Sequence, residues 1–387
     1  MGILALLVGQ SQLVNWFDVG VHSAVAGAYR QSGSVYGGSA GSWSAMPTTG
    51  NGANEFAAQL IAQYGVPVGM LGYASGGTLI SQWDQSTDTL PRHAIKAVQD
   101  CGGAVEYILW AQGEADGSSG TAQATYETAL TNVIANFRAQ ITNRSTKANL
   151  PIVLSLLGRG TSIGTDAQAS AIRAAQFAIA GSVSDVYIGA ETLDIPLADA
   201  AHYSAAGYVT HGKRMAQTVK YLLGDATYHR GPSIASAVVV DATTTDVTIS
   251  HRGGTDFTPT SAIVGFEIDD GGSIIVPSAA VRQSASVVRL THASLSSGSP
   301  TVRYGYGADG GDTYASTISN ILVDNTALTL PLEQSPQNVA ISASTSGVFV
   351  KISGVYLPSI SVHAKVAGVY KLANEIHLKQ AGVYAPI

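Results

Sequence analysis

Five short apolar runs, separated by amphipathic segments, dominate the first 225 residues of this 387-residue chain. Runs that are this short and apolar on both faces are typical of buried parallel strands. Strands that alternate with helices pack as an open parallel sheet with right-handed crossovers. The pattern therefore predicts a three-layer α/β domain. The runs are Ile3–Val8, Val66–Tyr73, Val105–Trp110, Ile152–Leu157 and Val186–Gly189.

The pattern changes after Asp225. From Gly231 to about Pro331, alternating stretches are separated by Gly, Ser, Thr and Asp turns without a helical period, which predicts an antiparallel β-sandwich. Residues 332–336 (LEQSP) resemble a linker. We predict an α/β domain at 1–228, a β-sandwich at 229–333 and a terminal segment at 334–387.

The terminal segment contains a 14-residue repeat of the form K-x-x-G-V-Y. Its three copies are marked by Lys351, Lys365 and Lys379. Each copy is predicted to form one β-hairpin. Hairpins of this size bury too little apolar surface to be stable alone, so we expect them to pack on a neighbour or on a larger assembly.

Composition narrows the function classes. Only 12% of residues are charged, the net charge is −6, and no basic cluster is present, so nucleic acid is not expected as a partner. No apolar run approaches the roughly 20 residues needed to span a bilayer. The start, MGILALLVG, lacks a basic region and a cleavage site, and we interpret it as the first strand rather than a signal peptide. No motif for a metal, nucleotide or flavin is found in the α/β domain, so no cofactor is expected.

Polar residues follow four of the predicted strands. The carboxyl ends of parallel strands meet at one edge of a sheet, where ligands collect. A serine after a strand is by itself usually a cap or turn residue. A hydroxyl, a glycine turn, an amide and a carboxylate–histidine pair placed in order are the parts that acyl transfer needs. The segments are GQSQ at 9–12, GYASGGT at 72–78, WAQGEAD at 110–116 and DAAH at 199–202.

These residues have complementary chemical roles. A serine hydroxyl becomes a strong nucleophile when an imidazole accepts its proton, and the imidazole needs a carboxylate on its other nitrogen. Asp199 precedes His202 by three residues, so one turn can present both side chains. The backbone N–H groups of Ser11 and of the Gly76-Gly77 turn, with the Gln112 amide, are candidate donors to an oxyanion.

The four segments resemble the SGNH/GDSL hydrolase superfamily, and within it the sialate O-acetylesterase-like carbohydrate esterases. That branch shows Gly-Gln-Ser-Asn, a Gly-Gly-Thr/Ser turn ahead of a tryptophan (here Trp83), Trp-x-Gln-Gly-Glu and Asp-x-x-His. The resemblance covers about residues 3–222 and implies a flavodoxin-like sheet. It implies the nucleophile Ser11, the base His202 with Asp199 behind it, and an oxyanion hole formed by Ser11, Gly76 and Gln112.

Several neighbours of these residues are candidates for supporting or substrate-binding roles. Gln12 replaces the usual asparagine, and its longer side chain is predicted to reshape the rim of the pocket. For Glu114 we expect a supporting hydrogen bond rather than a catalytic role. Gln10 and Gly77 are further candidates for support or for contact with substrate.

The resemblance implies a metal-independent serine esterase that releases acetate from an O-acetylated polysaccharide or another glycan. The β-sandwich resembles accessory domains that follow such esterase domains in some phage and bacterial proteins. The carboxyl-terminal repeats resemble those of phage structural proteins. We therefore expect an extracellular or virion-associated protein whose β domains position or anchor the enzyme, with the repeats mediating virion attachment or homotrimer formation. Two alternatives stay open: a catalytically inactive glycan-binding or structural virion module, and a short-chain lipase or thioesterase of the same fold.

Overall fold

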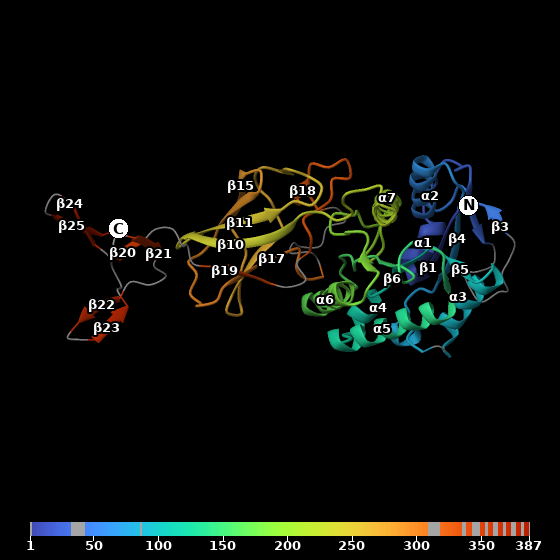
Figure 1. Cartoon of the computed structure of the whole chain (residues 1–387), viewed down its shortest axis with the longest axis horizontal. Coiled ribbons are helices and arrows are strands. Elements are labelled where there is room, and N and C mark those ends of the chain that lie inside the picture. Colours follow the sequence, from blue (N-terminus) through green and yellow to red (C-terminus); the bar gives the residue numbers. More distant parts are fainter. Residues whose placement is uncertain are drawn as a thin grey trace.

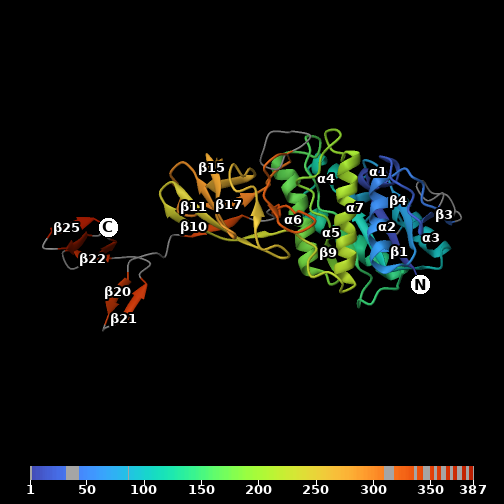
Figure 2. The same cartoon turned by 90° about the horizontal axis from the view of Figure 1, so that it is seen from above.

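The computed structural model describes residues 2–31, 43–85, 87–308, 318–334 and 338–342, and the backbone of six strands within 349–386. Figure 1 shows an α/β domain and a β domain next to one another along the long axis of the molecule. The view from above in Figure 2 agrees, with α6 on the side of the α/β domain that is closer to the β domain. No helix among the described residues is long and apolar enough to cross a membrane.

The sheet of the α/β domain has seven strands in the order β3-β2-β4-β1-β6-β8-β9. The five predicted strands are present and pair in parallel. Taken in chain order they lie 2-1-3-4-5, which is the flavodoxin-like arrangement. The predicted fold class is therefore confirmed. These strands are β1 (Ile3–Gly9), β4 (Val68–Ala74), β6 (Tyr107–Ala111), β8 (Ile152–Leu154) and β9 (Val186–Ile188).

Two strands that the sequence pattern did not predict extend the sheet beyond β4. They are β2 (Ala28–Gln31), which pairs in parallel with β4, and β3 (Trp43–Ala45), which is antiparallel to β2. All three residues of β3 are exposed, so this edge lacks the apolar run by which a buried strand is recognised.

Helices cover both faces of the sheet because alternate residues of β1 point to opposite sides. Ala5 and Leu7 pack in one core cluster with side chains of α1, α2 and α7. Leu6 and Val8 pack in the other cluster with α3, α5 and α6. The helices are α1 (Ser11–Asp18), α2 (Asn51–Tyr64), the 3-10 helix η1 (Ile80–Gln82), α3 (Thr89–Asp100), α4 (Glu114–Ser119), α5 (Gln123–Gln140), α6 (Asp166–Ser182) and α7 (Ala205–Leu222). A separate short pair joins β5 (Ala104–Val105) to β7 (Thr142–Asn143).

The β domain forms one eight-stranded sheet in the order β14-β13-β17-β19-β10-β11-β16-β15, with a separate β12–β18 pair. Residues from both halves of this sheet form a single hydrophobic cluster. All pairs are antiparallel except β10 with β19. The strands are β10 (Ser233–Asp241), β11 (Thr244–Ser250), β12 (Phe257–Thr258), β13 (Phe266–Asp270), β14 (Ser273–Ile275), β15 (Ala279–Ser284), β16 (Val287–Thr291), β17 (Thr301–Tyr304), β18 (Val323–Asp324) and β19 (Val339–Ser342).

The structure corrects the linker predicted at residues 332–336. Leu332 and Gln334 are buried, and β19, which follows them, pairs with β10 and β17. The sheet therefore continues beyond the predicted boundary at residue 333. Apolar and polar residues that are buried by distant strands cannot be distinguished from a linker by local composition.

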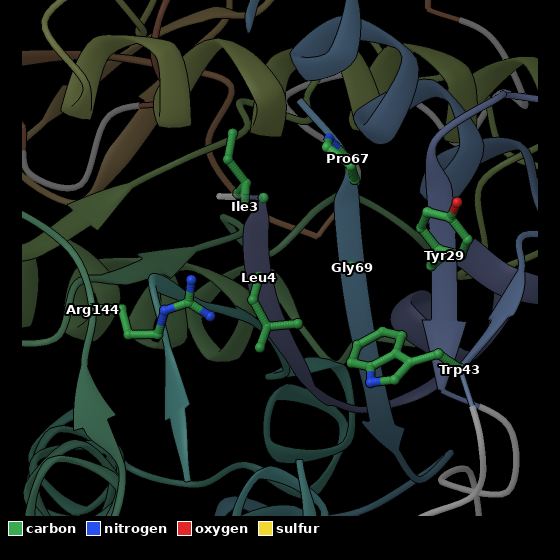
Figure 3. A pocket seen from close by; sticks show the side chains of 8 residues that line it. Ile3, Leu4, Tyr29, Trp43, Pro67, Gly69 and Arg144 are labelled. Carbon is green, nitrogen blue, oxygen red and sulfur yellow. The ribbon is translucent and has the colours of Figure 1, made fainter. Parts of the chain in front are cut away.

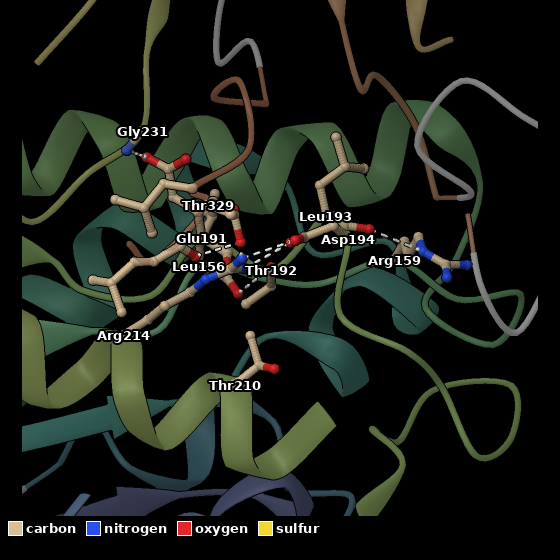
Figure 4. A network of polar contacts seen from close by, with 12 residues as sticks. Leu156, Arg159, Glu191, Thr192, Leu193, Asp194, Thr210, Arg214, Gly231 and Thr329 are labelled. Atoms are coloured by element: carbon tan, nitrogen blue, oxygen red, sulfur yellow. Dashed lines mark hydrogen bonds and ion pairs between the residues drawn. The ribbon is translucent and has the colours of Figure 1, made fainter. Parts of the chain in front are cut away.

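A buried polar network joins the two domains, as Figure 4 shows. Arg214 of α7 binds the Asp194 carboxylate with both terminal nitrogens, at 2.6 and 2.8 Å. It also donates to the carbonyl oxygen of Thr329 in the β domain at 3.3 Å. Burial raises the pKa of Glu191 to about 7, against the opposing effect of Arg230, and Glu191 accepts a hydrogen bond from the Gly231 amide. These buried charged groups must keep their partners, so the hydrogen bonds and ion pairs between them hold the two domains together.

Each copy of the terminal repeat contains one antiparallel strand pair. Their backbones are described, whereas the side chains of this region lie outside the described residues. The strands are β20 (Phe349–Ile352) with β21 (Val355–Pro358), β22 (His363–Val366) with β23 (Val369–Leu372), and β24 (His377–Gln380) with β25 (Val383–Pro386).

Candidate active site

The candidate site lies at the point where the strand order reverses. β1 is flanked by β4 on one side and β6 on the other, and Gly9 pairs with both Ala74 and Ala111. The three strands therefore end level with one another, and the polar segments that follow them meet at one edge. In open α/β sheets this reversal point is where ligands bind.

Gly9 makes the tight turn from β1 into α1. Its φ is +136°, and a Cβ at this position would lie 2.0 Å from the carbonyl oxygen of Ala111. The backbone amide of Gln10 donates to the same oxygen at 2.8 Å. This close approach puts Ser11 in the first position of α1, where backbone N–H groups have no partner within the helix.

Ser11, His202 and Asp199 form a continuous chain of hydrogen bonds. The Ser11 Oγ lies 2.9 Å from His202 Nε2, and His202 Nδ1 lies 2.9 Å from Asp199 Oδ2. The carboxylate fixes the proton on Nδ1, so Nε2 is free to accept the hydroxyl proton. The structure thus brings together three side chains that are separated by nearly two hundred residues.

Asp199 is held in its charged form by the same short loop. Partial burial acts to raise its pKa, but hydrogen bonds from the backbone amides of His202 and Ala201 and from the His202 ring outweigh it, and the net shift is downward. These amides donate to Asp199 Oδ1 at 2.8 and 2.9 Å. Asp199 therefore stays a carboxylate well into the acid range.

The Gly76-Gly77 turn lies beside Ser11. A Cβ built on Gly76 would be 3.7 Å from the Ser11 Cβ, and Gly77 has a φ of +69°. Both glycines are exposed. Gly76 therefore lies next to the nucleophile without a side chain in between, as a backbone donor to an oxyanion requires.

The structure corrects the role expected for Gln112. Its amide nitrogen already donates to the Thr78 carbonyl at 2.9 Å and to Asp116 Oδ2 at 2.5 Å. The Tyr126 hydroxyl donates to its oxygen at 2.8 Å, and the side chain is 2% exposed. Both amide protons are therefore used, and Gln112 holds the glycine turn in place instead of facing an oxyanion. The second of these protons is used by Asp116, a residue that the sequence did not single out.

Gln10 and Gln12 are both buried and point to different parts of the site. Gln10 Oε1 accepts hydrogen bonds from the amides of Gly113 and Ala115 at 3.3 and 3.5 Å, which ties β1 to the start of α4. Gln12 Nε2 donates to the Ala201 carbonyl at 2.8 Å, and Gln12 Oε1 accepts from the Tyr208 hydroxyl at 2.8 Å. Gln12 therefore holds the backbone next to the histidine and does not form the pocket rim, contrary to the prediction.

Glu114 lies close to the same residues. Burial raises its pKa, while a hydrogen bond from Gln12 and the proximity of His202 act in the opposite direction. A carboxyl group in this setting is suited to hold its neighbours by hydrogen bonds.

A second serine–histidine pair, which the sequence did not reveal, is fully buried. His211 Nε2 lies 2.7 Å from Ser155 Oγ, and Trp16 Nε1 donates to His211 Nδ1 at 2.6 Å. Because Nδ1 accepts, Nε2 carries the proton and cannot activate Ser155. Burial, followed by the nearby Arg214, lowers the pKa of His211 to about 3. This pair connects α1 with the end of β8 and has no access to substrate.

A pocket of about 360 Å³ lies at the other edge of the sheet. Figure 3 shows Tyr29, Trp43 and Arg144 around the amino-terminal ends of β1 and β4. None of the candidate site residues lines it. Among the described residues, no group of three or more His, Cys, Asp or Glu side chains could hold a metal ion.

Comparisons with known proteins give a family match for most of the α/β domain. Residues 42–221 match the family described as carbohydrate esterase, sialic acid-specific acetylesterase. The match includes the glycine turn, Gln112 and the Asp199–His202 segment, and it begins after Ser11, whose place in the site comes from the structure. No curated protein sequence matches significantly.

Several solved structures are similar to this chain to different degrees. A carbohydrate acetylesterase from Xanthomonas citri is 19% identical, with a TM-score of 0.66 over 86% of this chain and 80% of its own. A protein from Arabidopsis thaliana is 21% identical, with a TM-score of 0.45 over 58% of this chain and 98% of its own. A carbohydrate acetylesterase family member from Sinorhizobium meliloti is 12% identical, with a TM-score of 0.37 over 57% of this chain and 100% of its own. Residues 42–221 thus match the sialic acid-specific acetylesterase family of carbohydrate esterases, and the chain has the fold of a carbohydrate acetylesterase.

Proposed function

We propose that this protein removes O-acetyl groups from a carbohydrate through an acetyl-enzyme. Ser11 Oγ attacks the acetyl carbonyl carbon while its proton passes to His202 Nε2. The bond to the sugar oxygen then breaks, and that oxygen takes the proton from His202. Water attacks the acetyl-enzyme, again giving its proton to His202, and acetate leaves as Ser11 is regenerated. The hydrogen-bond chain from Ser11 through His202 to Asp199 carries this proposal.

The oxyanion formed in both steps is stabilised by backbone donors. The Ser11 N–H lies at the amino terminus of α1, where the helix dipole also favours negative charge. The Gly76 N–H is the second donor, because this residue lies next to the Ser11 side chain. Gln112 acts indirectly, through its hydrogen bond to Thr78 in the same turn.

A pocket of about 580 Å³ between η1 and α5 is suited to bind the sugar part of the substrate. The pocket begins at Leu79, one residue after the Gly76–Thr78 turn. Hydroxyl and carboxylate groups are the partners that sugar hydroxyls require. The polar residues that line the pocket are Ser81, Asp84, Asp116, Thr121, Thr125 and Thr128. We propose that a glycan chain, such as a bacterial surface polysaccharide, lies along this pocket.

We further propose that the protein acts outside the cell or on a virion, and that the terminal repeats attach it there or assemble it as a homotrimer. The support is the repeat itself, since its three copies form strand pairs with the same internal register. A measured molar mass of the full chain in solution, by light scattering, tests the trimer.

Hydrolysis of p-nitrophenyl acetate tests the catalytic assignment. We expect Ser11→Ala to lower kcat by about 10⁴-fold or more, and we expect a fluorophosphonate to label Ser11 in the wild type. Unchanged turnover in the variant would exclude Ser11 as the nucleophile. A series of nitrophenyl esters separates acetate release from lipase or thioesterase activity, since a preference for long acyl chains would contradict the proposal.

A further inference from the structure

The loop that carries His202 rests against a second loop of the α/β domain. We call residues 197–203 the histidine loop; a bridge between Leu197 and Tyr203 closes it. A Cβ on Gly160 would lie 2.2 Å from the carbonyl oxygen of Ala200. Ser162 donates to the same oxygen from its amide and its hydroxyl, at 3.3 and 3.2 Å. The position of the histidine loop therefore depends on residues 158–162.

Residues 158–162 are in turn held by the β domain. The Gly160 amide donates to the Ala308 carbonyl at 2.7 Å. The Arg173 guanidinium, which is buried, bridges the two segments because one nitrogen donates to the carbonyl oxygens of both Gly158 and Gly307. The β domain thus provides direct hydrogen-bond partners for the loop that supports the histidine.

Gly307 and Ala308 are themselves fixed on α6. The Ala308 amide donates to Asp166 Oδ1 at 2.9 Å, and the Gly307 amide donates to Ser170 Oγ at 3.1 Å. Gly307 has a φ of +88°, and a Cβ there would lie 2.3 Å from Asp166 Oδ1. Ala308 is buried in the same core cluster as α5 and α6. The contact of Gly307 and Ala308 with α6 is therefore packed and hydrogen-bonded like a contact within one domain.

We propose that the β domain is a structural part of the catalytic unit. Gly307 and Ala308 hold residues 158–162, which support the histidine loop and so keep His202 at hydrogen-bonding distance from Ser11. The proposal rests on the proposed function, since it takes His202 as the catalytic base. Beyond any role in targeting a polymer, the β domain then affects turnover of the smallest ester. Asp166 and Ser170 are positioning residues, because they contact the β domain and no reacting atom.

The double variant Asp166→Ala/Ser170→Ala in the full chain tests this proposal. It removes both acceptors of the β-domain segment while leaving the reacting groups in place. With p-nitrophenyl acetate we expect kcat to fall by about 5- to 30-fold and KM to stay within about twofold, because a displaced base slows chemistry rather than binding. The rate of Ser11 labelling by a fluorophosphonate is expected to fall by the same factor.

Two controls separate positioning from general damage. Asp166→Asn keeps an oxygen acceptor for the Ala308 amide, and we expect its kcat within about twofold of wild type. Asp246→Ala removes a β-domain ion pair with Arg289 that lies away from this contact, and we expect its kcat to be unchanged.

Each result decides the proposal. Wild-type kcat and labelling in the double variant would overturn it, as would an equal loss in the Asp246→Ala variant. In both cases the proposed function would stand, because the wild type is active. A wild type that neither hydrolyses the ester nor is labelled at Ser11 would instead overturn the proposed function and this inference with it.

Discussion

Replacement of Gln12 by methionine gives a direct test of how the histidine loop is held. Methionine has nearly the same length and shape as glutamine, so the buried space stays filled, but it cannot donate to the Ala201 carbonyl or to Glu114, or accept from the Tyr208 hydroxyl. The substitution therefore removes the 2.8 Å hydrogen bond that fixes the backbone next to His202, without touching the reacting groups.

The magnitude follows from the hydrogen bonds that are lost. A buried carbonyl left without its donor costs about 1–3 kcal/mol, and we expect the free energy of unfolding to fall by this amount. The net contribution of the Ala201 hydrogen bond, about 1 kcal/mol, is what favours the observed position of the loop. Its loss lowers the population of the productive arrangement, so we expect kcat to fall by about 5- to 10-fold at nearly constant KM.

The assay is the steady-state hydrolysis of p-nitrophenyl acetate, together with urea unfolding of the same variants. Tyr208→Phe is the matched control, because it removes the hydrogen bond that Gln12 accepts from Tyr208 and leaves the bond from Gln12 to Ala201 intact. We expect Tyr208→Phe to lose a similar amount of stability, about 1 kcal/mol, with kcat within about twofold of wild type. If Gln12→Met loses stability but keeps wild-type kcat, Gln12 only packs the core and the reasoning is wrong.

Three further predictions concern charge. Asp199→Asn should lower kcat by about 10²- to 10⁴-fold, since an amide does not hold the required tautomer of His202. In the wild type, Asp199 should stabilise the fold at pH values above the ordinary carboxyl pKa. This contribution should disappear as the pH falls through the lowered pKa of Asp199, which an acid titration of unfolding detects. Because His211 has a pKa of about 3 in the folded state and near 6.5 when unfolded, the free energy of unfolding should be about 2 kcal/mol lower at pH 5 than at pH 7, and His211→Phe should reduce this pH dependence in urea titrations. Arg214→Met leaves Asp194 partly buried without its partner and should cost about 3–5 kcal/mol in chemical unfolding; a loss below about 1 kcal/mol would show that the network contributes little.

The sequence predicted the α/β fold because buried parallel strands are apolar on both faces and are therefore visible as continuous runs. The predicted site segments follow such strands directly, so the ends of the runs also showed where polar residues would gather. β2 and β3 were missed for the same reason, since an exposed edge strand such as Trp43–Ala45 carries no apolar run.

The use of individual side chains depended on residues far away in the chain. A Trp-x-Gln-Gly-Glu motif indicates an amide at the strand end, but whether its protons are free depends on Thr78 and Asp116. Gln12 looked like a rim residue because it follows Ser11, whereas its partners Ala201 and Tyr208 lie almost two hundred residues later.

What the sequence by itself determined was the alternation of the five buried strands with helices and the chemical types at the strand ends, because both are set by local periodicity and by residue identity. Only the tertiary structure decided which amide protons are already used, that residues 332–334 are buried, and that Gly307 and Ala308 reach the loop behind the histidine. Hydrogen-bond partners and burial are properties of pairs of segments, and the pairing of distant segments is fixed only when the whole chain packs.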